Sequence, residues 1–143
     1  MLKKYTEVHE NCNQILYKNR EHKKMAEALS KAVGVEALTV DSPLTEDVDI
    51  LFLGSAVYAA GVDGKVKFIE NINVNVGKIV NFSSAALIES TYKQVKKIAE
   101  NNNIAMAEEE FHCRGAFKLI HRGRPNDEDL RNLQEFGKKI ISP

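Results

Sequence analysis

The sequence predicts an α/β domain built as a three-layer α/β/α sandwich around a five-stranded parallel sheet. Two observations support this. Short apolar segments alternate along the chain with segments in which apolar residues recur at helical spacing. The segment 48–54 is almost continuously apolar, as expected for a central parallel strand that is covered on both faces. Strands that alternate with helices imply right-handed crossovers and therefore a parallel sheet.

Five apolar segments are expected to form the strands, namely 13–18, 35–40, 48–54, 78–83 and 104–111. The triplet Glu108-Glu109-Glu110 indicates that the last strand becomes exposed near its end. Only residues 41–47 separate the second strand from the third, which leaves no room for a full helix. This connection must cross the sheet by another route, and a very short helix is one option.

Four helices are expected between and after the strands. Met25, Leu29 and Val33 recur at helical spacing over residues 22–33, and Gly34 stops this helix. The next two helices are expected over about 63–71 and 90–101. Asn126 caps the last helix, whose first turn carries three acidic residues where the helix dipole favours negative charge: Asp127, Glu128 and Asp129.

Length and charge limit the possible functions. The 143 residues fit one domain, here 13–143, with residues 1–12 as a tail or short extra segment. Twenty basic residues balance 20 acidic ones, which argues against a nucleic-acid binder that neutralises phosphates. No apolar run is long enough to span a bilayer, and no secretory signal follows the N-terminal Met-Leu-Lys-Lys. We therefore expect a cytoplasmic protein with no membrane contact.

The two cysteines do not form a recognisable site. Cys12 and Cys113 are far apart in sequence, which is typical of free thiols in a cytoplasmic chain. Their neighbours His9 and His112 could be imagined as zinc ligands, but the spacing fits no known zinc pattern, so we expect no metal. Ser55 lacks the G-x-S-x-G elbow of a hydrolase, and the sequence indicates no catalytic residue.

In an open sheet of this kind, ligands bind beyond the carboxyl ends of the strands, where the strand order reverses. With the order 2-1-3-4-5, that point lies between the first and third strands. In the loop 18–22, the helix N-terminus and Arg20 could bind a phosphate with Asn19 and His22, whereas the carboxylate of Glu21 would repel it. The alternative is that Asn19 simply caps an ordinary helix.

The loops after the third and fourth strands supply further candidates. Ser55, Ala56 and the small residues around Tyr58 leave room for a flat ring to stack on the tyrosine, although Tyr58 could also pack over the sheet edge. Ser83 and Ser84 could hydrogen-bond the edge of a heterocycle. The alternative for this second loop is a plain connection to the next helix.

Over about residues 13–141 the chain resembles the short flavodoxin-like domain proteins of anaerobic bacteria and archaea. The stretches that carry the resemblance are His-Lys-Lys-Met-Ala-Glu-Ala-Leu from 22, Leu-Phe-Leu-Gly-Ser-Ala-Val-Tyr-Ala from 51, Glu-Phe-His-Cys-Arg-Gly-Ala-Phe from 110, and Gly-Arg-Pro-Asn-Asp-Glu-Asp-Leu from 123. The segment Phe-His-Cys-Arg-Gly-x-Phe is the most specific of these. The resemblance implies a flavodoxin-like fold.

Flavodoxins bind FMN and pass electrons between partner proteins, so the resemblance also implies this function. Their phosphate loop ends Thr-Gly-Asn-Thr or similar. Here Arg20 stands for the glycine, Glu21 for the asparagine and His22 for the last threonine, while Tyr58 is retained. The leading hypothesis is an FMN-binding electron carrier that acts with redox partner proteins. The alternative is a flavin-free module that works by protein contact, and a third reading, a small flavin-dependent reductase, lacks a recognisable substrate pocket.

Overall fold

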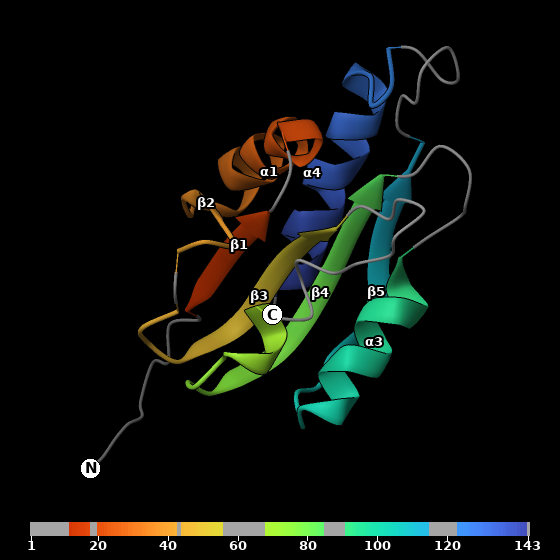
Figure 1. The fold of residues 1–143 in the computed structure, drawn as a ribbon. Helices are drawn as coiled ribbons and strands as arrows, with labels where there is room; N and C mark the ends of the chain where they lie inside the picture. Colours follow the sequence, from red (N-terminus) through yellow and green to blue (C-terminus); the bar gives the residue numbers. More distant parts are fainter. Residues whose placement is uncertain are drawn as a thin grey trace.

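A computed structural model describes residues 12–17, 20–42, 44–55, 68–84, 91–114 and 123–142. Its sheet has five parallel strands in the order β2-β1-β3-β4-β5, which confirms the predicted topology (Figure 1). The strands are β1 (Asn13–Tyr17), β2 (Ala37–Thr39), β3 (Val48–Ser55), β4 (Val76–Ser84) and β5 (Met106–Cys113). All five therefore end at the same edge of the sheet, called the carboxyl edge below.

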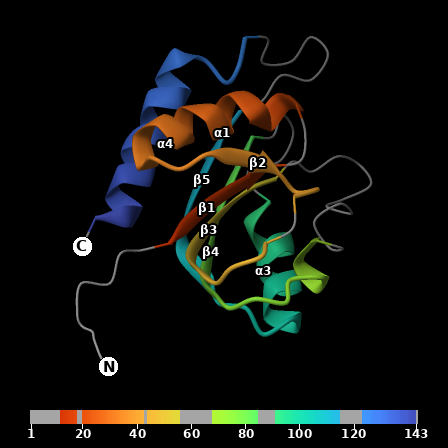
Figure 2. The ribbon, with the colours of Figure 1, turned by 90° about the vertical axis from the view of Figure 1, so that its left-hand side faces the viewer.

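Helices cover both faces of the sheet. Helices α1 (Arg20–Val33) and α4 (Asp127–Ile141) pack side by side on one face, and α3 (Tyr92–Asn101) lies on the other (Figure 2). These three layers are the predicted sandwich. No helix in the described ranges is long and apolar enough to cross a membrane.

Strand β3 forms the centre of the core, as its apolar run predicts. Ile50 and Phe52 face α1 and α4, whereas Leu51 and Leu53 face α3, because successive side chains of a strand point to opposite faces. All four are at most 6% exposed. Both faces of this strand are therefore buried, which explains why its sequence does not alternate between apolar and polar residues.

The connection from β2 to β3 differs from the prediction, and the helix expected after β3 is described only in part. The second strand is shorter than predicted, and the chain from Val40 to Asp47 (Pro43 apart) crosses to β3 through turns and bends, without the short helix considered above. Val40 and Leu44 pack against the core on the α3 side, so apolar contacts hold this connection in place. Of the helix expected over 63–71, the described part is Phe68–Glu70, where Ile69 is buried.

The last helix begins with the predicted cap. Asn126 accepts a hydrogen bond from the Asp129 N–H, and the Asp129 carboxylate accepts one from the Asn126 N–H, which together form a capping box. Further along α4, a side chain at Gly137 would collide with Leu29 and approach Val33 of α1 to 3.1 Å. The glycine therefore allows the two helices to pack closely.

The edge strand β5 and the two cysteines also agree with the predictions made from the sequence. Glu108 and Glu109 are exposed, as the acidic triplet predicts. Cys12 and Cys113 are both free thiols. Cys12 precedes β1 and Cys113 ends β5, so parallel strands put them at opposite edges of the sheet, and they are unrelated.

Candidate functional site

Polar residues gather at the carboxyl edge, next to the point where the strand order reverses. The chain leaves β1 toward β2 on one side and leaves β3 toward β4 on the other. Ser55 ends β3 and is in register with Ser83, and Ser84 ends β4 in register with Cys113. Three serines predicted as ligand contacts therefore lie on neighbouring strands.

His22 joins this group from the first turn of α1. Its side chain is buried, with 1% of the residue exposed. The Ser84 N–H donates a hydrogen bond to His22 Nε2 over 3.4 Å, and Ser84 Oγ lies at the same distance from this nitrogen. His22 thus links the start of α1 to the end of β4, across the end of β3.

This contact defines the state of the His22 ring. A backbone N–H can only donate, so the Nε2 atom that receives it must carry a lone pair rather than a proton. The tautomer assigned from this contact is the neutral imidazole with its proton on Nδ1. In this state, Nε2 of His22 offers no N–H to a phosphate.

Gly54, the residue before Ser55 in β3, has no side chain, and the ring of Phe82 packs against it. It lies on the face of β3 that α1 and α4 cover, one register position before Ser55. A side-chain Cβ at this position would lie 2.7 and 2.8 Å from ring atoms of Phe82 and 3.3 Å from Cβ of Tyr17. The Phe82 ring therefore occupies the space over β3 that a side chain would need.

Ser83 points to the opposite face, the one that α3 covers. On this face Asn81 donates a hydrogen bond of 2.9 Å to the hydroxyl of Thr91, just before α3. Ser83 Oγ is fully buried and has no hydrogen-bond partner in the described part of the chain. A buried hydroxyl without a partner costs about 1–3 kcal/mol, so a ligand that supplied one would recover this free energy.

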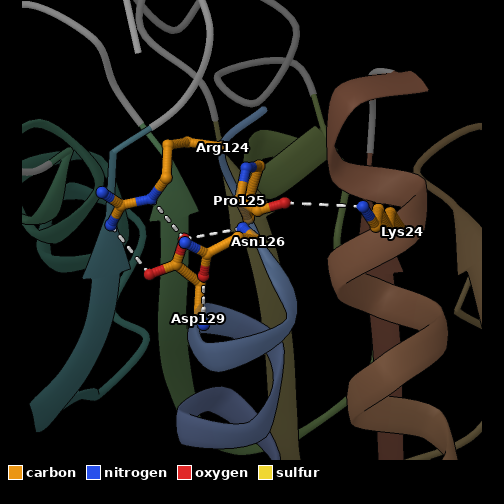
Figure 3. A network of polar contacts seen from close by, with 5 residues as sticks. All are labelled: Lys24, Arg124, Pro125, Asn126 and Asp129. Carbon is orange, nitrogen blue, oxygen red and sulfur yellow. Dashed lines mark hydrogen bonds and ion pairs between the residues drawn. The ribbon is translucent and has the colours of Figure 1, made fainter. Parts of the chain in front are cut away.

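A second polar cluster lies at the start of α4, beside the end of β5 (Figure 3). Arg124 binds both carboxylate oxygens of Asp129, with N···O distances of 2.6 and 2.8 Å. Lys24 of α1 donates to the carbonyl of Pro125 over 3.4 Å. The Lys24 bond therefore connects the start of α4 to α1, and the Arg124 bonds hold that start together.

Burial, hydrogen bonds and charges shift three pKa values in and beside this cluster. Partial burial by itself would raise the pKa of Asp129, but hydrogen bonds from Arg124 and from the Asn126 N–H lower it below the usual range. The same hydrogen bond raises the pKa of Arg124. Burial, and secondarily the nearby Asp129 carboxylate, raises the pKa of Cys113 to about 12. At neutral pH this favours the protonated thiol of Cys113 over the thiolate.

The structure describes some of the predicted site residues and not others. Arg20 begins α1 and Ser55 ends β3. His22 and Ser84 meet at the carboxyl edge, whereas Ser83 points to the other face of the sheet. Asn19, Ala56 and Tyr58 lie outside the described residues. The sequence did not reveal the pairing of Arg124 with Asp129, although Asn126 followed three residues later by Asp129 is a capping-box pattern.

The chain is similar in structure to flavodoxins. A flavodoxin from the domain Archaea superposes with a TM-score of 0.67 at 14% identity, covering 90% of this chain and 94% of that one. The oxidised flavodoxin 2 of Bacillus cereus gives 0.61 at 16% identity, over 88% and 94%. The rubredoxin oxygen:oxidoreductase of Desulfovibrio gigas gives 0.60 at 15% identity, over 90% of this chain and 34% of that longer one.

Sequence comparison adds a relative that matches over most of both chains. An uncharacterized protein of Methanocaldococcus jannaschii is 26% identical over 144 residues, which covers 89% of this chain and 96% of that protein. No family model matches the chain. The structural similarity and the strand order together show that this protein has the flavodoxin-like fold, which confirms the resemblance stated from the sequence.

Proposed function

We propose that this protein binds FMN at the carboxyl edge of its sheet and carries electrons between redox partner proteins in the cytoplasm. The observation that supports the proposal most is the buried hydroxyl of Ser83, which lies beside the point where the strand order reverses and has no hydrogen-bond partner among the described residues. FMN would supply the redox chemistry, and the protein would bind and orient it.

Each part of the flavin has a candidate partner in the chain. The backbone amides that open α1, together with the charge of Arg20, would bind the phosphate. Ser55, Ser83 and Ser84 would hydrogen-bond the ring system, with Tyr58 stacked on it and Ala56 leaving space. Asn19 would contribute its amide beside Arg20.

One observation favours the alternative of a flavin-free module that acts by protein contact. Nε2 of His22, at the position of the last threonine in the phosphate loop, accepts a hydrogen bond from within the protein and is not available as a donor. Glu21 adds a negative charge in the same turn. A chain that had lost its phosphate site would tolerate both features.

Two substitutions of neighbouring residues separate these functions. Glu21→Gln removes a carboxylate from the phosphate loop, and Arg20→Gln removes a cation from it. A unit charge about 4 Å from a phosphate contributes about 1 kcal/mol in water, or roughly a fivefold change in Kd. If FMN binds through its phosphate, Glu21→Gln should tighten binding and Arg20→Gln should weaken it, as measured by flavin fluorescence.

Riboflavin, which lacks the phosphate, is the control and should respond little to either change. A matching response of riboflavin would show that the phosphate is not bound at this loop. If the purified protein shows no flavin absorbance, and neither the wild type nor Glu21→Gln binds added FMN, the contact module replaces the electron carrier.

A further inference from the structure

We infer that His22 is a positioning residue: its neutral imidazole connects the first turn of α1 to the last residue of β4 and does not bind the phosphate itself. The inference gives His22 a role within the proposed flavin site and so rests in part on the proposed function. Its location, its hydrogen bond, its burial and the packing beside it support this role.

The location of His22 lets one side chain affect two candidate binding segments. It lies in the turn of α1 whose amides would bind a phosphate, two residues after Arg20. Its partner Ser84 is the last residue of β4 and follows Ser83, a candidate contact to the ring system. The link spans 62 residues of sequence, so no local structure holds these two segments together.

The direction of the hydrogen bond excludes one role and supports the other. Because Ser84 donates its N–H to Nε2, the ring is an acceptor at this atom and cannot also donate from it to a phosphate. The residue is also only 1% exposed, so its ring packs inside the protein. Both observations are expected of a side chain that holds the start of α1 and the end of β4 together.

Gly54 has no side chain, so the Phe82 ring packs over the end of β3 on the face that α1 and α4 cover. Ser84 follows Phe82 by two residues and bonds to His22 of α1. Removing the His22 acceptor should therefore loosen Ser84 relative to α1. Both the phosphate and the ring system would then bind less well.

Glutamine and asparagine at position 22 provide the test. The amide oxygen of glutamine reaches about as far as Nε2 and can accept the Ser84 N–H, whereas that of asparagine reaches only about as far as Nδ1. His22→Gln should bind FMN and riboflavin nearly as the wild type does. His22→Asn should weaken both flavins together, by about threefold to tenfold, the equivalent of one lost hydrogen bond. Lys23→Gln, an exposed change in the same turn, is the control.

A second readout needs no flavin. In the full chain, amide hydrogen exchange of Ser84 should be faster in His22→Asn than in His22→Gln, while the β3 amides stay protected and show that both variants are folded. Nitrogen-15 NMR of the wild-type imidazole should show a proton on Nδ1 and none on Nε2.

The outcomes separate the inference from the proposed function. A loss of FMN affinity with riboflavin unchanged, in both variants, would make His22 a phosphate ligand and overturn the inference. A proton on Nε2 at neutral pH, or equal Ser84 exchange in all variants, would also overturn it. If no flavin binds but Ser84 exchange responds as stated, the positioning role stands and only the proposed function fails.

Discussion

Replacing Gly54 by alanine tests how closely the carboxyl edge is packed. The added Cβ would lie 2.7 and 2.8 Å from Cζ and Cε2 of Phe82 and 3.3 Å from Cβ of Tyr17. Phe82 is 0% exposed, so its ring cannot move into solvent and must displace other core groups. The substitution is therefore expected to strain the core rather than fill an empty space.

The expected cost combines two opposing effects. Overpacking a core costs about 1–3 kcal/mol. Alanine recovers about 0.5–1 kcal/mol because it loses less backbone entropy on folding than glycine does. We therefore expect Gly54→Ala to lower the free energy of unfolding by roughly 1–2 kcal/mol.

A double-mutant cycle identifies the Phe82 ring as the cause. Phe82→Leu removes the far end of the ring and should itself destabilise the protein by about 1–2 kcal/mol, because it leaves a small cavity. In the double variant the new methyl group fills part of that cavity. The combined loss should therefore fall short of the two single losses added together, by at least about 1 kcal/mol.

Urea unfolding followed by far-ultraviolet circular dichroism measures these differences, since the chain has no tryptophan to report by fluorescence. Gly34→Ala is the control: Gly34 has φ +78° and no atom within 4 Å of an added Cβ, so only backbone strain is tested. Its effect should add to that of Phe82→Leu within about 0.5 kcal/mol. Additive losses for Gly54→Ala and Phe82→Leu would refute the packing argument.

Three further predictions follow from the core, the α4 cluster and the flavin site. Leu51→Ala should cost about 2–5 kcal/mol in urea unfolding, because Leu51 is 0% exposed in the central strand, and fast hydrogen exchange over β3 in the folded protein would contradict this. Asp129→Asn should be less stable than the wild type at neutral pH, since the pKa of this carboxyl is lowered in the folded state. The difference should be complete above about pH 4 and disappear as the pH falls through the lowered pKa, and Asp127→Asn, an exposed change in the same turn, should cost less stability at neutral pH. Tyr58→Ala should weaken any flavin that binds, measured by fluorescence titration, and an unchanged Kd would remove Tyr58 from the site.

Much of the fold could be predicted from the sequence because it depends on local or repeated patterns. The nearly unbroken apolar run of β3 indicated a strand buried on both faces, and Ile50 to Leu53 are indeed core residues. The last helix starts at its predicted cap, because Asn126 bonds a backbone N–H only three residues away. The path from β2 to β3 was harder to predict, since contacts of Val40 and Leu44 with a distant core determine it.

For the candidate site, too, some features could be predicted from the sequence and others could not. The sequence by itself determined which polar residues follow the strands, because in a parallel sheet the ends of all strands share one edge. Only the tertiary structure decided that His22 turns inward to Ser84, that Phe82 lies over Gly54, and that Arg124 pairs with Asp129. The physical reason is that direction and distance between side chains depend on how helices cross the sheet and how strands align in register. Those quantities come from the packing of the whole domain, and no local spacing of residues encodes them.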